Sequence, residues 1–181
     1  MDDFQPLATA YEARASASPS SKLDLLMDIE RLHDPRVVPF LLNVLADQNE
    51  PDAVRIHVLK QLRYGVGQLI STDHMSVAMA ISEVLAGPSR SEVRVHAALA
   101  LGRFTHVDTA LSHLGAICLV QDESIDLRYA AFTSLERAGP TPQCIALLRE
   151  IASDDTLGGS ARTVLSAWHV AQLDHSSEER L

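Results

Sequence analysis

The stretch SEVRVHAALAL (91–101) recurs in altered form three more times in this chain, each time with an arginine at the same place. The other copies are DAVRIHVLKQL (52–62), IDLRYAAFTSL (125–135) and GSARTVLSAWH (159–169). The shared arginines, Arg55, Arg94, Arg128 and Arg162, follow one another at intervals of 39, 34 and 34 residues. An earlier segment, SKLDLLMDIERL (21–32), fits the same frame with Lys22 in the arginine place. A repeat period of about 20–50 residues predicts a solenoid.

Apolar residues within each copy follow the period of one helix face. In the copy that contains Arg55, these residues are Val54, Val58, Leu59, Leu62 and Val66. The following copies repeat the pattern with Val93, Ala97, Ala98 and Leu101, and then with Leu127, Ala131, Phe132 and Leu135. In the last copy, Ala161 and Leu165 keep the pattern while Ser166 and His169 break it, as expected of a polar repeat that caps the stack.

Another amphipathic run precedes each of the last four copies, at 35–47, 75–86, 107–120 and 141–152. Each unit is therefore predicted to be a hairpin of two helices, and no segment favours a strand. The sequence predicts an all-α, right-handed solenoid of about five helical hairpins. It divides into an N-terminal helix and loop (1–20), the repeat solenoid (21–172) and a polar tail (173–181). Asp52, Ser91 and Ser124 are expected to cap second helices, because their side chains can accept from free amides.

The repeats resemble HEAT repeats, and most closely the short type named after phycobilin lyases. The resemblance is carried by DPRVVPFLL (34–42) and by Glu92-Val93-Arg94, and it covers about residues 21–172. It implies that the second helices line the concave side of the stack. It also implies that an acid in the turn pairs with the arginine of the second helix, which fits Asp122 with Arg128. The Arg94 unit has Pro88-Ser89 at that place, so we expect the series of acid–arginine pairs along the repeats to be incomplete.

Composition and charge narrow the classes of function. The chain of 181 residues has 15 basic and 24 acidic residues, for a net charge of −9, and its bases are scattered. Such a surface repels phosphate backbones, so no nucleic-acid partner is expected. No run approaches the roughly 18 apolar residues of a membrane span, and the N-terminus lacks the apolar region of a signal peptide. We therefore expect no membrane partner and a cytoplasmic protein whose two cysteines, Cys118 and Cys144, are buried thiols.

Two histidines raise the question of a metal site. His57 and His96 both lie two residues after the repeat arginine, so a stack would place them on one face of neighbouring helices. A stable zinc site needs at least three protein ligands, and the equivalent later positions are Ala130 and Val164. Di-iron hydroxylases of the HEAT fold use His-Glu dipeptides, and this sequence has none. We therefore predict no metal and no cofactor.

Nucleophilic catalysis would need a nucleophile beside an oriented base. The available pairs are Ser112 with His113 and Ser166 with His169. The first two residues are adjacent on a helix and do not face one another. The second two share a face, but no acid on that helix would orient the imidazole. The sequence therefore predicts no catalytic residues and a protein that is not an enzyme.

The side of the second helices that faces away from the core is the candidate binding surface. It mixes apolar, aromatic and basic residues over three units, as protein interfaces do. The predicted partner-binding residues are Ile56, His57, Lys60, Tyr64, Val95, His96, Leu99, Arg103, Tyr129, Thr133 and Arg137. The alternative is that neighbouring units cover Val95 and Leu99 within the chain.

The function that this pattern favours is a non-catalytic adaptor or regulator, a scaffold that binds a partner protein through the second helices. A second hypothesis, which comes from the family resemblance, is a phycobilin lyase-like subunit acting on a client protein that carries a tetrapyrrole. The scarcity of aromatic residues, at 4%, weighs against stacking on such a chromophore. A third hypothesis is a homo-oligomer formed through the same surface.

Overall fold

The computed structural model describes residues 2–13, 18–65 and 71–168. Within these ranges it contains ten α-helices and no strand, which confirms the all-α prediction. The helices are α1 (Phe4–Glu12), α2 (Pro19–Glu30), α3 (Val37–Ala46), α4 (Asp52–Tyr64), α5 (Ser71–Ala86), α6 (Ser91–Leu101), α7 (Asp108–Leu119), α8 (Ile125–Ala138), α9 (Pro142–Ile151) and α10 (Gly158–Ala167). The predicted polar tail, 173–181, lies outside the described residues.

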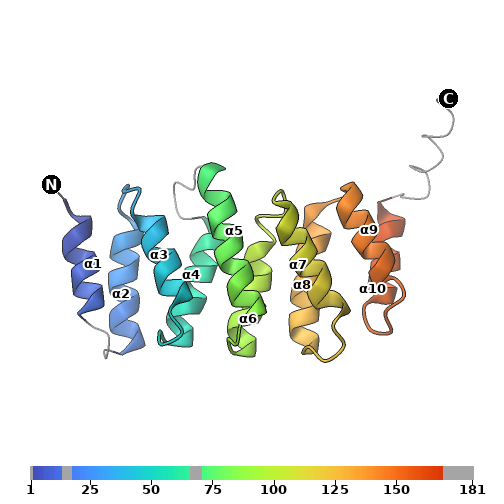
Figure 1. Ribbon diagram of the computed structural model, residues 1–181, viewed down its shortest axis with the longest axis horizontal. Coiled ribbons are helices and arrows are strands. Elements are labelled where there is room, and N and C mark those ends of the chain that lie inside the picture. The colour runs from blue at the N-terminus through green and yellow to red at the C-terminus, as the bar shows by residue number, and fades with distance from the viewer. Residues whose placement is uncertain (1, 14–17, 66–70, 169–181) are drawn as a thin grey trace.

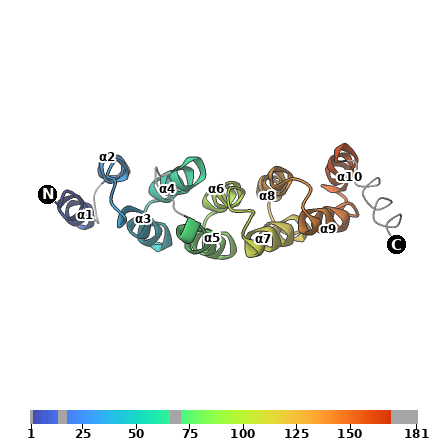
Figure 2. The same cartoon turned by 90° about the horizontal axis from the view of Figure 1, so that it is seen from above.

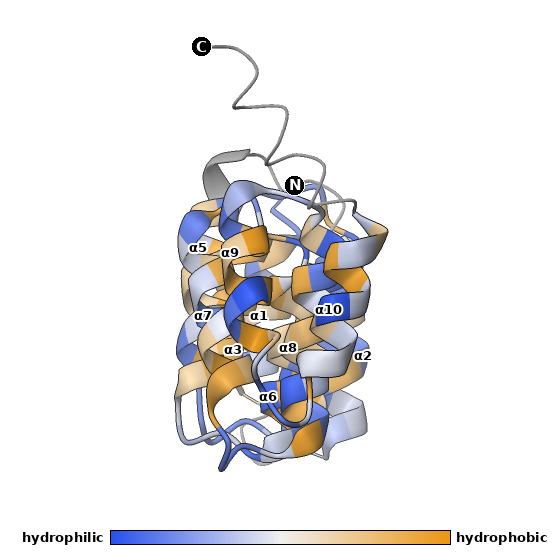
Figure 3. Cartoon of the chain, turned by 90° about the vertical axis from the view of Figure 1, so that its right-hand side faces the viewer, coloured by the Kyte–Doolittle hydropathy of each residue, from blue (hydrophilic) through white to orange (hydrophobic). Residues whose placement is uncertain are grey.

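The ten helices stack as five hairpins in a single row (Figure 1). Each odd-numbered helix packs against the even-numbered helix that follows it, and each hairpin packs against the next. The odd helices form one layer and the even helices the other, and the even layer lies on the inner side of a shallow curve (Figure 2). Seen along the long axis, the two layers stand side by side (Figure 3). The second helices of the repeats therefore line the concave side, as the resemblance implied.

One continuous apolar core runs between the two layers, from Phe4 to Val164. The helical period predicted its members well: Val54, Val58, Leu59 and Leu62 of α4 are all fully buried. The equivalent residues of α6 and α8 are buried too, and Leu165 of the last unit packs partly buried against the core. Val66 lies outside the described residues. The predicted helix faces are thus the faces that hold the stack together.

The N-terminal helix belongs to the stack, whereas the sequence pattern placed it before the solenoid. Phe4, Ala8 and Tyr11 of α1 are buried in the common core. The Phe4 and Tyr11 rings both meet Phe40 of α3 edge to face, with centroids 5.8 and 5.4 Å apart. The first hairpin is therefore α1 with α2, and the repeat solenoid begins near residue 4 rather than at residue 21.

The helix starts differ in part from those predicted. Ser124 caps α8 as expected, since its hydroxyl accepts from the Leu127 amide at 3.3 Å. Asp52 and Ser91 are instead the first residues of their helices, and neither Pro51 nor Arg90 before them makes a side-chain cap. The predicted loop at the end of segment 1–20 is shorter than expected, because α2 already begins at Pro19 with Ser18 as its cap.

The repeat arginines tie each hairpin to itself. Arg55 donates from Nε to the carbonyl oxygen of Leu45 at 3.0 Å. Arg94 does the same to Leu85 at 2.8 Å, and Arg128 to Cys118 at 3.0 Å. Arg162 donates to the carbonyl of Ala152. These carbonyls lie in the last turn or at the cap of the first helix of the same hairpin, where an α-helix leaves its acceptors unpaired. The recurring arginine therefore joins the two helices of its own unit.

Three of the cations at the repeat position, including Lys22 of the first unit, also bind a carboxylate of the next hairpin. Lys22 lies 2.7 Å from a Glu50 oxygen, Arg94 2.8 Å from Glu123, and Arg128 2.6 Å from Asp154. The predicted pairing of Asp122 with Arg128 inside one unit is wrong: Asp122 is exposed, and the carboxylate comes from the turn of the following unit. We call these cation–carboxylate pairs between consecutive hairpins the ladder.

Both cysteines are buried, as predicted. Cys118 and Cys144 are fully inaccessible, and their thiols lie against the carbonyl oxygens of Arg128 and Leu135. Burial raises the pKa of Cys118 to about 12 and that of Cys144 to about 11. A thiol reacts as its thiolate. Burial therefore protects these two cysteines in two ways: it keeps reagents out, and it keeps the thiols protonated.

We therefore expect neither thiol to react with Ellman's reagent in the folded protein at mildly alkaline pH. Addition of denaturant should release two equivalents of reactive thiol per chain. The absorbance of the released product measures both numbers. Fast modification of one thiol without denaturant would contradict the buried placement of that cysteine.

Candidate partner-binding face

The candidate face lies on the concave side of the stack, on α4, α6 and α8 (Figure 2). These three helices are consecutive neighbours in the even layer. Six of the eleven predicted residues are exposed there: Lys60, Tyr64, Arg103, Tyr129, Thr133 and Arg137. The two tyrosines stand out, because 73% of the Tyr64 surface and 43% of the Tyr129 surface is open to solvent. We call these six residues the concave patch.

The other five predicted residues are less available. Ile56 is buried, with only 8% of its surface exposed, so it cannot present a side chain to a partner. Val95 and Leu99 are partly buried and pack against the core. His57 and His96 are half-buried. The spacing of residues along a single helix could not predict this burial. In the stack, α4 and α6 each lie between two neighbouring helices, which cover positions beside the core face.

Arg103 reaches the end of α4 at one edge of the concave patch, although it comes from a different hairpin. Arg103 donates from Nη1 to the carbonyl oxygen of Arg63 at 3.3 Å. The Arg63 guanidinium lies 5.0 Å from the centre of the Tyr64 ring. Gly65 ends α4 with φ of 117°, and a β-carbon there would lie 3.2 Å from Arg103 Nη1. The glycine thus provides both the left-handed turn and the room in which Arg103 crosses to α4.

Charge is distributed unevenly along the face. Acidic residues stand in the first turns of α4, α6 and α8, namely Asp52, Glu92 and Asp126. Arginines stand at the opposite ends: Arg63 and Arg137 in the last turns, and Arg103 just beyond α6. This arrangement complements the helix dipoles. Arg63, Arg103 and Arg137 therefore mark one edge of the concave side, which we call the basic edge, and Tyr64 lies there.

Burial lowers the pKa of His96, and the nearby Lys60 lowers it further. His96 is therefore a neutral side chain at neutral pH. His57 has a partner of its own, since its Nε2 lies 2.9 Å from an oxygen of Glu30 on α2. His57 is thus engaged with the preceding hairpin.

A second pair of histidines was not anticipated from the sequence. His74 of α5 and His106 in the turn before α7 face each other, with Nδ1 and Nε2 3.0 Å apart. The two residues are 32 positions apart, close to the repeat interval, which is the one sequence signal that could have found them. In the described part of the chain no group of three or more potential ligands gathers, so this pair lacks the third protein ligand of a zinc site.

Within the described ranges, the hydroxyl of Ser112, the serine of the first candidate nucleophile pair, has two hydrogen-bond partners, neither of them an imidazole or a carboxylate. Ser112 donates to the carbonyl oxygen of Asp108 at 3.3 Å and accepts from Gln143 Nε2 at 3.2 Å. Both contacts are structural links, one within α7 and one to α9. His169, the imidazole of the second pair, lies outside the described residues.

Comparison with solved structures shows a likeness in fold. The chain is similar to human deoxyhypusine hydroxylase, solved in complex with glycerol, with a TM-score of 0.44 and 17% sequence identity. The superposition covers 90% of this chain and 84% of the hydroxylase. No protein-family profile and no curated protein matches the sequence. None of the helices in the described ranges combines the length and the apolar character that a membrane crossing requires.

Proposed function

We propose that the protein is a non-catalytic adaptor or regulator that binds a partner protein through the concave patch. The observation that carries the proposal is the exposure of Tyr64 and Tyr129 on one concave surface, on the two helices that flank α6, in a chain that buries most of its other aromatic residues. Large exposed side chains on a curved face of rigid helices offer a preformed surface to a complementary protein.

The residue types in the patch support the same proposal. Tyrosine and arginine are the types most enriched among residues that dominate binding energy. Here Arg103 binds the backbone of Arg63 next to Tyr64 at the basic edge, and Tyr129 lies on α8, on the other side of α6. Lys60, Thr133 and Arg137 add exposed polar groups on the same two helices. A mixture of aromatic and charged residues is the usual composition of a protein interface.

The proposal can be tested by affinity capture from the native cell, read by mass spectrometry, followed by titration of the partner that it yields. We expect the double variant Tyr64→Ala/Tyr129→Ala to weaken binding by about 2 kcal/mol or more, the usual cost of truncating a dominant contact residue. Because both side chains lie on the surface, outside the apolar core, its thermal unfolding should match that of the wild type.

A matched control lies on the convex layer. Met79 of α5 is 54% exposed, so Met79→Ala removes a comparable exposed apolar side chain from the opposite side. We expect this variant to bind the partner with wild-type affinity. Loss of binding in Met79→Ala together with full binding in the tyrosine variant would place the interface on the odd-numbered helices and contradict the proposal.

The tetrapyrrole hypothesis stays a prediction from the family resemblance. Co-expression of the chain with a bilin distinguishes it from the adaptor proposal. A coloured, tightly bound pigment would favour the lyase-like subunit, and a colourless product would favour the adaptor.

A further inference from the structure

One rung of the ladder differs from the others. Glu50 and Glu123 each lie five residues before a repeat arginine, and each binds the cation of the preceding hairpin. Ser89 occupies the same position before Arg94. Its hydroxyl accepts from Nη2 of Arg55 at 3.1 Å, where the other rungs hold a carboxylate. Arg55 is therefore the interior repeat cation without an acidic partner among the described residues.

The guanidinium of Arg55 is nevertheless deeply buried. Only 4% of the residue surface is exposed, similar to 3% for Lys22 and 4% for Arg128, both of which are paired. Its partners in the described chain are two neutral oxygens, those of Leu45 and Ser89. Taking a charge out of water without a counter-ion costs several kcal/mol. The Arg55 guanidinium is thus desolvated like the cations of the other rungs, but without a compensating negative charge.

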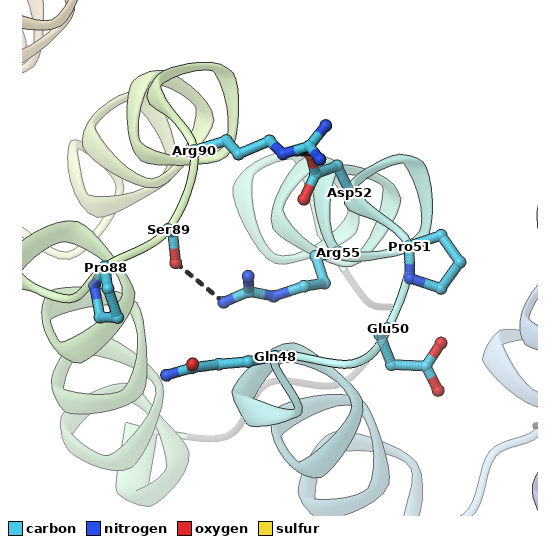
Figure 4. A pocket seen from close by; sticks show the side chains of 8 residues that line it. All are labelled: Gln48, Glu50, Pro51, Asp52, Arg55, Pro88, Ser89 and Arg90. Carbon is cyan, nitrogen blue, oxygen red and sulfur yellow. Dashed lines mark hydrogen bonds and ion pairs between the residues drawn. The ribbon is translucent and has the colours of Figure 1, made fainter.

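The place of the missing carboxylate is open space. A pocket of about 490 Å³ lies between the second and third hairpins, lined by Arg55, Ser89, Arg90 and the turn that precedes α4. The Arg55 side chain extends across this pocket toward Ser89 (Figure 4). The two acids that line it are already occupied, because Glu50 binds Lys22 and Asp52 lies 3.4 Å from Arg90. The net charge that the pocket presents therefore comes from Arg55.

We propose that this pocket binds a carboxylate, supplied by an acidic side chain of a partner polypeptide, which completes the ladder in trans. The neighbouring rung shows the geometry that such a group would adopt, since Glu123 binds both terminal nitrogens of Arg94. Bidentate pairs of this kind are among the strongest polar contacts in proteins. The pocket is larger than one carboxyl group, so it also has room for the chain that carries it. The site lies at the inter-helix turns, away from the concave patch, and does not depend on the function proposed for that patch.

The structure suggests a direct observable. Because Arg55 Nε–H is buried and donates to Leu45, its side-chain NMR signal should be protected from exchange and visible. We expect this signal to shift saturably when sodium acetate replaces sodium chloride at constant ionic strength. The peptide acetyl-Gly-Glu-Gly-amide should produce the same shift, and its glutamine counterpart should not. The Nε signals of Arg94 and Arg128, whose rungs are filled, are internal controls and should not move.

Two substitutions at one position complete the test. Ser89→Glu introduces a glutamate at the position that Glu50 and Glu123 occupy in the other units. Its carboxylate should pair with Arg55, abolish the Arg55 shift and raise the midpoint of thermal unfolding by about 2–4 °C. Ser89→Ala leaves the pocket open and should keep the shift. The absence of a saturable shift, or a shift that persists in Ser89→Glu, would overturn the proposal. A shift with acetate but not with the glutamate peptide would retain the carboxylate site and assign it to small free acids instead of a polypeptide.

Discussion

Val58→Glu should yield a chain that no longer folds cooperatively. Val58 is fully buried in α4, at the centre of the core between the two layers. A carboxylate there would lie inside the apolar core, and burying an unpaired charge costs several kcal/mol. That cost is comparable with the whole stability of an ordinary domain, about 5–15 kcal/mol. Far-ultraviolet circular dichroism and a thermal melt should show lost helix and no sharp transition.

The control for this substitution is on the same helix. Lys60 lies two residues further on and is exposed in the concave patch, so Lys60→Glu introduces the same side chain into solvent. We expect it to melt close to the wild type. If the two variants melted alike, the assignment of the α4 faces would be wrong, and with it the division of the second helices into a core side and a concave side.

Asp154→Asn should lower the free energy of unfolding by about 3–5 kcal/mol, the usual cost of breaking one partner out of a buried pair. The Asp154 side chain is 3% exposed and lies 2.6 Å from Arg128. Its other oxygen accepts from the amides of Leu157 and Thr156 at the start of the last hairpin turn. The substitution would therefore leave the Arg128 guanidinium buried without a counter-ion. Denaturant unfolding at neutral pH measures the loss.

The same pair predicts a pH dependence. The Leu157 amide most strongly, and the Thr156 amide and Arg128 with it, hold the pKa of Asp154 below its ordinary value of 3.8 against the opposing effect of burial. A carboxyl with a lowered folded pKa stabilises the protein above its unfolded pKa, and the stabilisation is lost as pH falls through the folded value. Asp154→Asn should therefore lose less stability than the wild type on acidification. Asp155→Asn, at the exposed neighbouring residue, should change unfolding by no more than about 0.5 kcal/mol.

The sequence could predict the helices and the core because both are local patterns. The spacing of Val54, Val58 and Leu62 identifies a helix and its buried side without reference to any neighbouring helix. The N-terminal helix carried the same kind of signal in Phe4, Ala8 and Tyr11, a spacing of four and three that places them on one face. The recurring arginine likewise locates the hairpins along the chain, because it marks the same point in each second helix.

The contacts between units could not be predicted in the same way. The family resemblance implied Asp122 as the partner of Arg128, but the actual partner, Asp154, is 26 residues away and depends on how one hairpin stacks on the next. The burial of Ile56 has the same origin, since a helix flanked on both sides loses more surface than one helix face implies. The pairing of His74 with His106 is a further product of the stacking.

The forward reach of the ladder has a consequence for the growing chain. In each ion pair the cation is made first and its carboxylate follows later, 28 residues on for Lys22, 29 for Arg94 and 26 for Arg128. Proteins fold from the N-terminus as synthesis proceeds. The cation of a newly emerged hairpin of this chain therefore has no counter-ion until the turn of the next hairpin has emerged as well. The last step of packing for one unit is thus timed by the synthesis of the unit after it, and the second hairpin, whose Arg55 meets only a serine, completes translation with that charge still unneutralised.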